Sequence, residues 1–522
     1  MIKQLHSRLR QRVELEKLSF WKLFALQAVL FFAIYGIMLV PRFSTDAYSV
    51  YFYSGDGLGG FLELGRIGTF LLYKALLALG VNSVTMSPFF TAVFCLTVAW
   101  SSAVFLSKLT AYFPYMNWLT FLFVEFAVVL AYANIYFAEL FFFSDVALMY
   151  TFNIFFMTLA LCFFFHRNRI VGVVLSLICL CCSLSFYQAS LGMFMILSSV
   201  LVLLKHDVLW PRPEKRSAVP LLRELFCLLV AGGGASVANL LTLNILSSVG
   251  FYSNRSPSLH LADILGSIRQ MVSQFSFYYS WGYPSYLTGI LKVIFIISGP
   301  ALLFIMADSF DRHSKKRYPL SSIVITLLVL IANLLLVLSP HFLSKNVWIP
   351  PRSIFSFFAL FSFMAIITGY NHGREGKGVS LAVLAVMLIL VGANIAVIQR
   401  IALDQIELNH LDRLEAEAIV EYIRAYEEDS GQTVETISWR SDGNYTWTYP
   451  EIKYTFMDMN IRAGGRSWSL TDCIGYYAGR RFRSEQMPDE RWALYFQDKS
   501  WDAFEIEEQI RFEGSTMYLM TY

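Results

Sequence analysis

Residues 20–46 read FWKLFALQAVLFFAIYGIMLVPRFSTD, an apolar run to Val40 followed after five more residues by the carboxylate of Asp46. A run of about twenty apolar residues has the length of one helical bilayer crossing. Over the 522 residues, 56% are hydrophobic and 15% are charged, whereas soluble proteins carry about 25% charged residues. The sequence therefore predicts a polytopic α-helical membrane protein.

The charge and cysteine patterns exclude other classes. The net charge is only +3, and no basic cluster is interleaved with aromatic residues, so no nucleic-acid partner is expected. Six cysteines lie in apolar runs and Cys473 has no obvious partner, which argues against a disulfide framework or a zinc site. No metal motif is present, and no cofactor is expected.

Hydropathy predicts about eleven spans, and this odd number places the two chain ends on opposite sides. The predicted spans are roughly 20–40, 86–107, 117–136, 146–165, 169–186, 188–204, 221–249, 286–306, 319–338, 353–369 and 379–398.

Loop charges predict the orientation, because Lys and Arg concentrate in cytoplasmic loops. Residues 1–19 are basic and are interpreted as a cytoplasmic segment of an uncleaved signal anchor. With this end inside, the same side receives the basic loops HRNR (166–169), KHDVLWPRPEKR (205–216), DRHSKKR (311–317) and HGREGK (372–377). The opposing loops near 137–145 and 186–188 carry no Lys or Arg.

The composition changes near Gln399. An amphipathic helical pattern follows the last span, and runs such as TVETISW and RWALYF then alternate with polar turns, as in strands. We therefore expect a membrane domain at 20–398 with its first external loop at 41–80, and a small extracytoplasmic α/β domain at 399–522.

The first external loop carries the main catalytic candidates, Asp46 and Asp56. A carboxylate at the membrane boundary can act as a general base toward a hydroxyl. Helix capping by Asp46 and a turn role for Asp56 are the structural alternatives. A helical pattern from Phe61 to Gly80 places Glu63 and Arg66 near one face, as substrate-binding groups or as an ordinary surface ion pair.

Two further external segments add polar candidates. Glu139 and Asp145 lie among aromatic residues at the start of the fourth span, where Asp145 is either a second functional carboxylate or a helix cap. Tyr187 and Gln188 occupy the next external turn, where they either contact substrate or cap the two helices.

The loop SPHFLSKNVWIPPRSIF supplies His341, Lys345 and Arg352. Cations on the external side depart from the positive-inside pattern, and arginine can bind a phosphate through two hydrogen bonds. We therefore predict binding of a lipid phosphate here, with snorkelling of the long side chains as the alternative.

Several of these stretches resemble one enzyme family. TDAYS in the first loop, the pair Gly65 and Arg66, the turn SFYQAS and the tail segment SWSLTDCIGYYAGRRF are similar to the serotype-converting, Gtr-type bacterial glucosyltransferases. These enzymes belong to the GT-C class of membrane glycosyltransferases. The resemblance implies a GT-C-like fold in a bacterial cytoplasmic membrane, with the active site on the extracytoplasmic side.

The resemblance also implies a polyprenyl-phosphate-linked sugar donor, with glucose as the sugar. The acceptor would be a surface polysaccharide such as O-antigen, teichoic acid or wall polysaccharide, and a flippase and a donor synthase would be partners. An essential first-loop carboxylate would be Asp46 or Asp56, joined by Asp145 or Glu139, with Arg352 or Lys345 at the donor phosphate.

Two other functions fit parts of the sequence. A transporter or flippase of lipid-linked sugars would share the spans, and Glu125 is the most conspicuous carboxylate within one, but no internal repeat is visible. An accessory membrane protein that presents its tail for binding would leave the first-loop carboxylates without a role.

Overall fold

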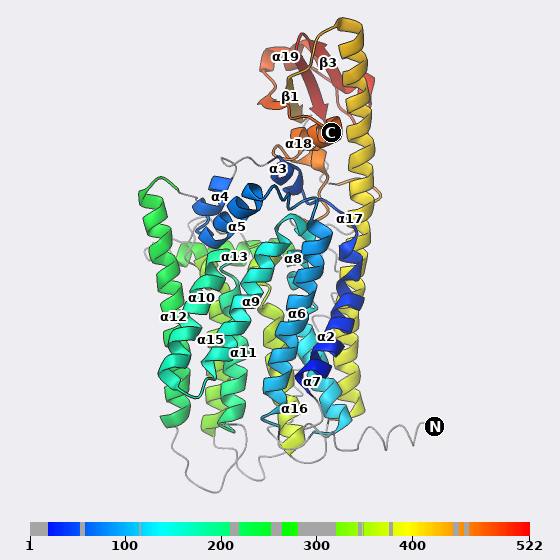
Figure 1. Ribbon diagram of the computed structural model, residues 1–522. Helices are drawn as coiled ribbons and strands as arrows, with labels where there is room; N and C mark the ends of the chain where they lie inside the picture. Colours follow the sequence, from blue (N-terminus) through cyan, green and yellow to red (C-terminus); the bar gives the residue numbers. More distant parts are fainter. Residues whose placement is uncertain are drawn as a thin grey trace, which may run out of the picture.

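The computed structural model describes residues 19–52, 58–113, 116–208, 219–251, 264–279, 320–342, 347, 349–374, 379–441, 448–453 and 459–522. Long helices run side by side in a bundle, and a small region with a sheet lies beyond one end of it (Figure 1). The long helices are α2 (Phe20–Tyr35), α6 (Ser87–Thr110), α7 (Trp118–Tyr132), α9 (Ala147–Phe164), α10 (Arg169–Phe186), α11 (Ser190–Lys205), α12 (Val219–Ser248), α13 (Ile264–Tyr279), α15 (Leu320–Phe342), α16 (Phe357–Arg374) and α17 (Leu381–Ser430).

The protein is a multi-pass helical membrane protein, as predicted. Among the described residues, eight helices are long and apolar enough to cross a bilayer, or nine if the bent pair α7 and α8 (Ile135–Phe142) forms one span. The helix at the expected span 188–204 is α11, which has only 16 residues. The expected span 286–306 lies outside the described residues, so the total of eleven stays a prediction.

The bend between α7 and α8 begins at Asn134, where a side chain replaces the missing helical acceptors. Its Oδ1 atom accepts hydrogen bonds from the backbone N–H groups of Tyr136 and Phe137 at 3.1 and 2.9 Å. This capping starts a new helix, which turns by 47° from the axis of α7. Helix α8 consequently brings Glu139 to the bundle end nearest the C-terminal region, which we call the head end.

Short helices cover the head end (Figure 1). After α2 come η2 (Gly36–Leu39), α3 (Ala47–Tyr51), α4 (Gly59–Glu63) and α5 (Ile67–Ala78). The turns η4 (Ser144–Val146) and η7 (Pro351–Ile354) lie before α9 and α16. At the opposite or base end, Glu224 of α12 binds Arg169 of α10 and Lys205 of α11, the latter at 2.7 Å.

Helix α17 links the bundle to the C-terminal region. It has 50 residues and is therefore about 75 Å long, more than twice the roughly 30 Å of a hydrocarbon core. Its second half leaves the bundle and packs through Ile419, Val420 and Ile423 against the C-terminal sheet. Gly431, at φ 67°, ends the helix in the left-handed conformation that glycine adopts without strain.

The C-terminal sheet has four strands in the order β2-β1-β4-β3. Strand β1 (Thr436–Ser441) pairs in parallel with β2 (Arg483–Gln486) and β4 (Thr516–Thr521), and β3 (Ile510–Glu513) is antiparallel to β4. The helices beside it are η8 (Ala463–Gly465), α18 (Leu470–Ala478), α19 (Asp489–Tyr495) and α20 (Ile506–Gln509).

The strand expected at RWALYF was wrong, because these residues belong mainly to α19. Pro488 precedes this helix, and Asp489 and Glu490 in its first turn complement its N-terminal dipole. These helix-start signals prevail over the aromatic residues that suggested a strand. The expected strand TVETISW overlaps β1.

A buried polar contact joins three helices inside the bundle. Gln27 of α2 donates a 2.5 Å hydrogen bond to Oε1 of Glu125 on α7, and Ser102 of α6 donates to Oε1 of Gln27 at 2.8 Å. All three side chains are buried. The carboxylate is thus held by neighbouring helices, which gives Glu125 a structural role.

We predict that Glu125→Ala lowers the melting temperature, because it leaves the buried amide of Gln27 without its acceptor at a cost of about 1–3 kcal/mol. Glu125→Gln is the matched control, since it retains an acceptor oxygen. Thermal unfolding of both variants in detergent measures the effect. Unfolding of Glu125→Ala at the wild-type temperature would contradict this role.

Candidate functional site

Asp46 lies at the start of α3 and faces the C-terminal region. Its side chain makes no capping hydrogen bond to α3. Instead, its Oδ1 atom accepts a 3.0 Å hydrogen bond from the indole Nε1 of Trp468, more than 400 residues later in the chain. The capping alternative therefore does not describe Asp46, which lies half-buried where the first loop meets the C-terminal region.

Asp145 lies directly beneath this loop and is buried. Its Oδ1 atom accepts a hydrogen bond from Ser44 at 3.0 Å, and its backbone oxygen accepts one from Tyr73 of α5 at 2.5 Å. The N-cap residues of η4 and α9 are Phe143 and Val146, so Asp145 occupies neither cap position. The carboxylates of Asp46 and Asp145 lie within electrostatic range of each other, so two acidic groups from different loops meet here.

Arg42 fixes the path of the first loop, although it was not among the residues predicted for the site. Its guanidinium is fully buried and donates hydrogen bonds to the backbone oxygens of Met38 and Phe141. Burial lowers the pKa of Arg42 to about 9, and the nearby Asp145 carboxylate opposes this shift. The sequence signal that could have identified Arg42 is the presence of an arginine directly after a membrane span.

Helix α17 holds the same loop from its other side. The side-chain amide of Asn409 accepts a hydrogen bond from the N–H of Phe43 at 2.8 Å and donates one to its carbonyl at 3.0 Å. A loop residue has no helical partner for these backbone groups. The side chain of Asn409 thus supplies both hydrogen-bond partners of Phe43, which lies three residues before Asp46.

Glu139 and Arg352 form an ion pair at the head end. The Nη1 atom of Arg352 lies 2.6 Å from Oε1 of Glu139, and the backbone N–H of Arg352 donates to the other carboxylate oxygen. The guanidinium carbon also lies 4.4 Å from the ring centre of Phe143. The turn η7 and helix α8 are therefore joined by a pair with little access to solvent.

Arg66 lies on this cationic side of the site. Its guanidinium carbon is 4.9 Å from the ring centre of Tyr187, which contacts Tyr150 edge to face. Burial lowers the pKa of Arg66; Tyr187 and Tyr150 oppose this shift, and the charge of Arg352 adds to it. Among the described residues, no carboxylate pairs with Arg66, and its Nε atom is buried without a hydrogen-bond partner.

The expected continuous helix with Glu63 and Arg66 on one face was wrong. Gly65 has φ 71° and ends α4, and α5 begins only after Arg66. Glu63 is exposed, whereas the guanidinium of Arg66 turns inward over Tyr187. The expected surface ion pair between the two is therefore absent among the described contacts.

The other predicted site residues that the structure describes, Gln188 and His341, both contact groups at the head end. Gln188 donates a 2.8 Å hydrogen bond to the backbone oxygen of Leu64, so it holds the first loop. The Nε2 atom of His341 lies 3.0 Å from the hydroxyl of Ser353, next to Arg352. Asp56 and Lys345 lie outside the described residues. Within the part of the chain that the structure describes, no group of three or more ligand side chains could hold a metal ion.

The head end thus combines an acidic side, Asp46 and Asp145, with a cationic side, Arg66 and Arg352. Electrostatic contacts connect the two sides, since the charge of Arg352 acts on Asp145 as well as on Arg66. Such a site can take a proton from a hydroxyl and can bind an anion close by.

Comparisons with known proteins agree with this chemistry. The model of the family described as Glucosyl transferase GtrII matches residues 35–369, more than half of the chain. The match includes the first loop and the turns that carry Glu139, Tyr187 and Arg352, and it ends before α17. No curated protein and no solved structure matches the chain.

Gly65 and Gly80 give a matched test of the turn that directs Arg66 inward. Both have positive φ, 71° and 68°, but a Cβ atom on Gly65 would lie 2.4 Å from Leu243, whereas a Cβ on Gly80 meets nothing within 4 Å. We expect Gly80→Ala to cost about 1–2 kcal/mol from the backbone conformation, and Gly65→Ala to cost roughly 1–3 kcal/mol more from the clash.

Thermal unfolding of the two variants in the same detergent measures this difference. Equal losses of stability would show that α12, which carries Leu243, moves away without cost, and would contradict a close packing of the turn against α12.

Proposed function

The chain belongs to the GtrII family of glucosyltransferases, and we propose that it transfers glucose from a polyprenyl-phosphate-linked donor to a cell-surface polysaccharide. One observation carries the proposal: a half-buried carboxylate, Asp46, lies at the same end of the bundle as a half-buried guanidinium, Arg66, that no described carboxylate neutralises. A hydroxyl acceptor and a phosphate leaving group need these two groups side by side.

In the proposed reaction, Asp46 acts as the general base. An acceptor hydroxyl oxygen attacks the anomeric carbon of glucose and forms the new glycosidic bond, while its proton passes to the Asp46 carboxylate. The bond between the anomeric carbon and the phosphate oxygen breaks, and the lipid phosphate leaves with the electron pair. Asp145 is buried beneath Asp46 and positions the first loop through Ser44.

Arg66 and Arg352 are proposed to bind the phosphate of the donor. The charge of Arg352 acts on Arg66, and a phosphate would balance the charge of Arg66, with which no described carboxylate pairs. The Glu139 carboxylate holds Arg352 in place, and the ring of Tyr187 supports Arg66 from one face. The arrangement favours a group with negative charge, and this charge increases as the lipid phosphate leaves.

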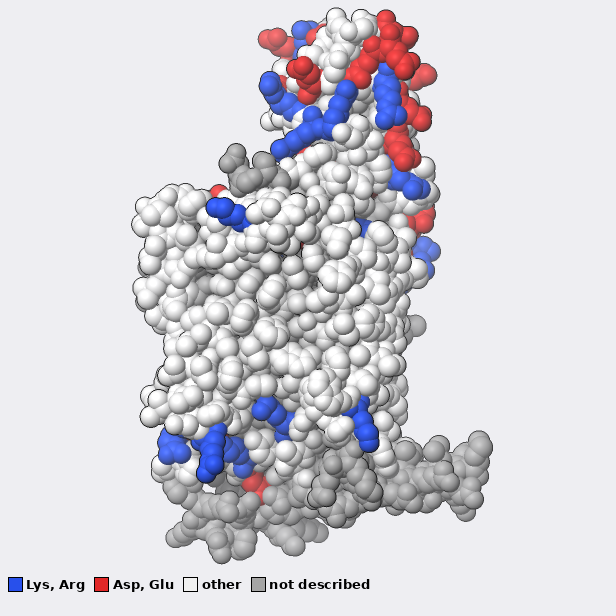
Figure 2. Space-filling model, viewed as in Figure 1, with Lys and Arg blue, Asp and Glu red and all other residues white. Residues whose placement is uncertain are grey.

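The proposed side of the membrane follows from charge. The charged groups visible at the base end are almost all Lys and Arg, whereas those beyond the head end are a mixture of basic and acidic groups (Figure 2). Lys108, Arg167, Arg169, Lys205 and Arg223 lie on short connections or near helix ends of the bundle. By the positive-inside rule the base end would face the cytoplasm of a bacterium. The head end and residues 399–522 would then face outward, where a lipid-linked donor arrives after a flippase and a donor synthase have acted.

We predict that Asp46→Asn lowers the transfer rate about a hundredfold or more, the usual contribution of a general base. Asparagine keeps an acceptor oxygen for Trp468, so the fold should survive. Release of polyprenyl phosphate from synthetic polyprenyl-phosphate glucose, with a surface polysaccharide present, measures transfer. Asp429→Asn, an exposed carboxylate at the far end of α17, is the control. Full transfer by folded Asp46→Asn would exclude Asp46 as the base.

We predict that Arg66→Gln raises the KM for the donor about tenfold or more, since a charge-assisted hydrogen bond to phosphate is lost. Arg66→Lys should fall between this variant and wild type, because lysine keeps the charge but not the two-pronged geometry. Steady-state kinetics against donor concentration distinguish the three proteins. An unchanged donor KM in Arg66→Gln would place the phosphate elsewhere.

A further inference from the structure

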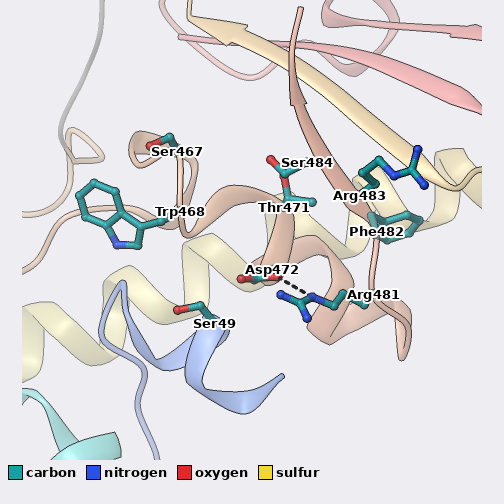
Figure 3. Close-up of a pocket in the computed structure, with 9 residues that line it drawn as sticks. All are labelled: Ser49, Ser467, Trp468, Thr471, Asp472, Arg481, Phe482, Arg483 and Ser484. Atoms are coloured by element: carbon teal, nitrogen blue, oxygen red, sulfur yellow. Dashed lines mark hydrogen bonds and ion pairs between the residues drawn. The ribbon is translucent and has the colours of Figure 1, made fainter. Parts of the chain in front are cut away.

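A hollow lined by polar and aromatic side chains lies between the first loop and the C-terminal region (Figure 3). Its volume is about 640 Å³, within the range of small-ligand sites. Ser49 of α3 forms one wall, and the other walls come from the segments before, within and after α18. The family match ends before all of the C-terminal walls. Its C-terminal lining comprises Ser467, Trp468, Thr471, Asp472, Arg481, Phe482, Arg483 and Ser484.

The hollow adjoins the proposed general base. Trp468, which lines it, is the residue that donates a hydrogen bond to Asp46. Ser49, on the opposite wall, is one helical turn from Asp46 and donates its hydroxyl to the Asp46 backbone oxygen at 2.9 Å. A molecule in the hollow therefore contacts the indole that is hydrogen-bonded to the carboxylate that would accept a proton.

The lining has the side chains that bind sugars. Trp468 is 46% exposed, and an exposed indole offers a flat apolar surface together with a polar edge. The hydroxyls of Thr471 and Ser484 are 3.0 Å apart on the upper wall in Figure 3. Hydroxyl groups of this kind donate and accept hydrogen bonds, as the hydroxyls of a sugar require.

The charge of the lining favours an anion. Arg481 and Arg483 are 60% and 75% exposed, and their carboxylate contacts are long: 3.9 Å to Asp472 and 4.0 Å to Glu485. Ion pairs this exposed contribute little to stability, so both guanidinium groups can turn toward a ligand at small cost. With one carboxylate and two guanidinium groups, the lining carries net positive charge.

We propose that this hollow binds the acceptor, and that the acceptor is an acidic polysaccharide carrying phosphodiester or carboxylate groups. The inference rests on the proposed function for the identity of Asp46 as the base. A sugar unit lies against Trp468 with its hydroxyl directed to Asp46, and the negative group of a neighbouring unit is bound by Arg481 and Arg483. The C-terminal region thus selects the acceptor, whereas the bundle binds the donor.

The test measures direct binding to the purified full-length protein in detergent at about 0.15 M salt, where long-range charge effects are screened. The probes are an oligomer of glycerol phosphate and, as the neutral comparison, maltoheptaose. We expect Arg481→Gln/Arg483→Gln to weaken binding of the glycerol phosphate oligomer about tenfold or more. Arg413→Gln/Arg424→Gln removes the same charge from exposed arginines that do not line the hollow and should bind as wild type does.

Trp468→Phe supplies a second test, because phenylalanine keeps an aromatic face but cannot donate to Asp46. We expect Trp468→Phe to retain most of the binding of the glycerol phosphate oligomer and to lose glucose transfer. The reason is that its side chain cannot donate the hydrogen bond that aligns the hollow with Asp46. Equal binding of the oligomer by wild type and the hollow variant would overturn the proposal, and so would equal or tighter binding of maltoheptaose by wild type.

The binding and transfer measurements together distinguish failure of the proposed acceptor site from failure of the proposed function. If the proposed function is wrong, wild type releases no polyprenyl phosphate from the donor, while the binding measurements still report on the hollow. If only the acceptor assignment is wrong, Asp46→Asn loses transfer and Arg481→Gln/Arg483→Gln keeps the wild-type KM for the acceptor.

Discussion

The two hydrogen bonds between Asn409 and the backbone of Phe43 are the contact on which the geometry of the site depends. Asn409 belongs to α17, and α17 also forms part of the core of the C-terminal region. A polar loop at a membrane boundary has few ways to satisfy its backbone groups. Because one helix side chain satisfies them here, the first loop and the C-terminal region share one rigid support, and Trp468 can lie against Asp46.

Buried polar contacts on the bundle side complete this support. Arg42 satisfies backbone oxygens at the ends of η2 and α8, where helical acceptors lack partners. Glu139 accepts a hydrogen bond from the backbone N–H of Arg352 and also neutralises the side chain of that arginine. The first loop, helix α8 and the turn η7 are thus joined by charge-assisted hydrogen bonds. Arg66 differs from these groups, since no described carboxylate balances it, and the proposed binding of the donor phosphate rests on this difference.

The sequence predicts much of this arrangement because hydropathy and charge are local signals. Apolar runs of bilayer length predicted the membrane helices, and polar residues next to them predicted which side chains lie at the head end. Local signals of this kind do not identify contacts between residues that are distant in the sequence. Nothing near Asp46 indicates Trp468, and nothing near Arg42 indicates the carbonyl of Phe141. The direction of Arg66 depends on the positive φ of Gly65, which a helical periodicity does not reveal.

Helix α17 determines how far the C-terminal region lies from the bundle. Since it runs unbroken from the bundle to Ser430, the C-terminal sheet can approach or leave the bilayer only if this helix bends or tilts. The distance between the lipid surface and the hollow is consequently set by the length of the helix. In a polymer that grows from a membrane anchor, the repeat unit that receives glucose would then be chosen by its height above the lipid, as well as by its chemistry.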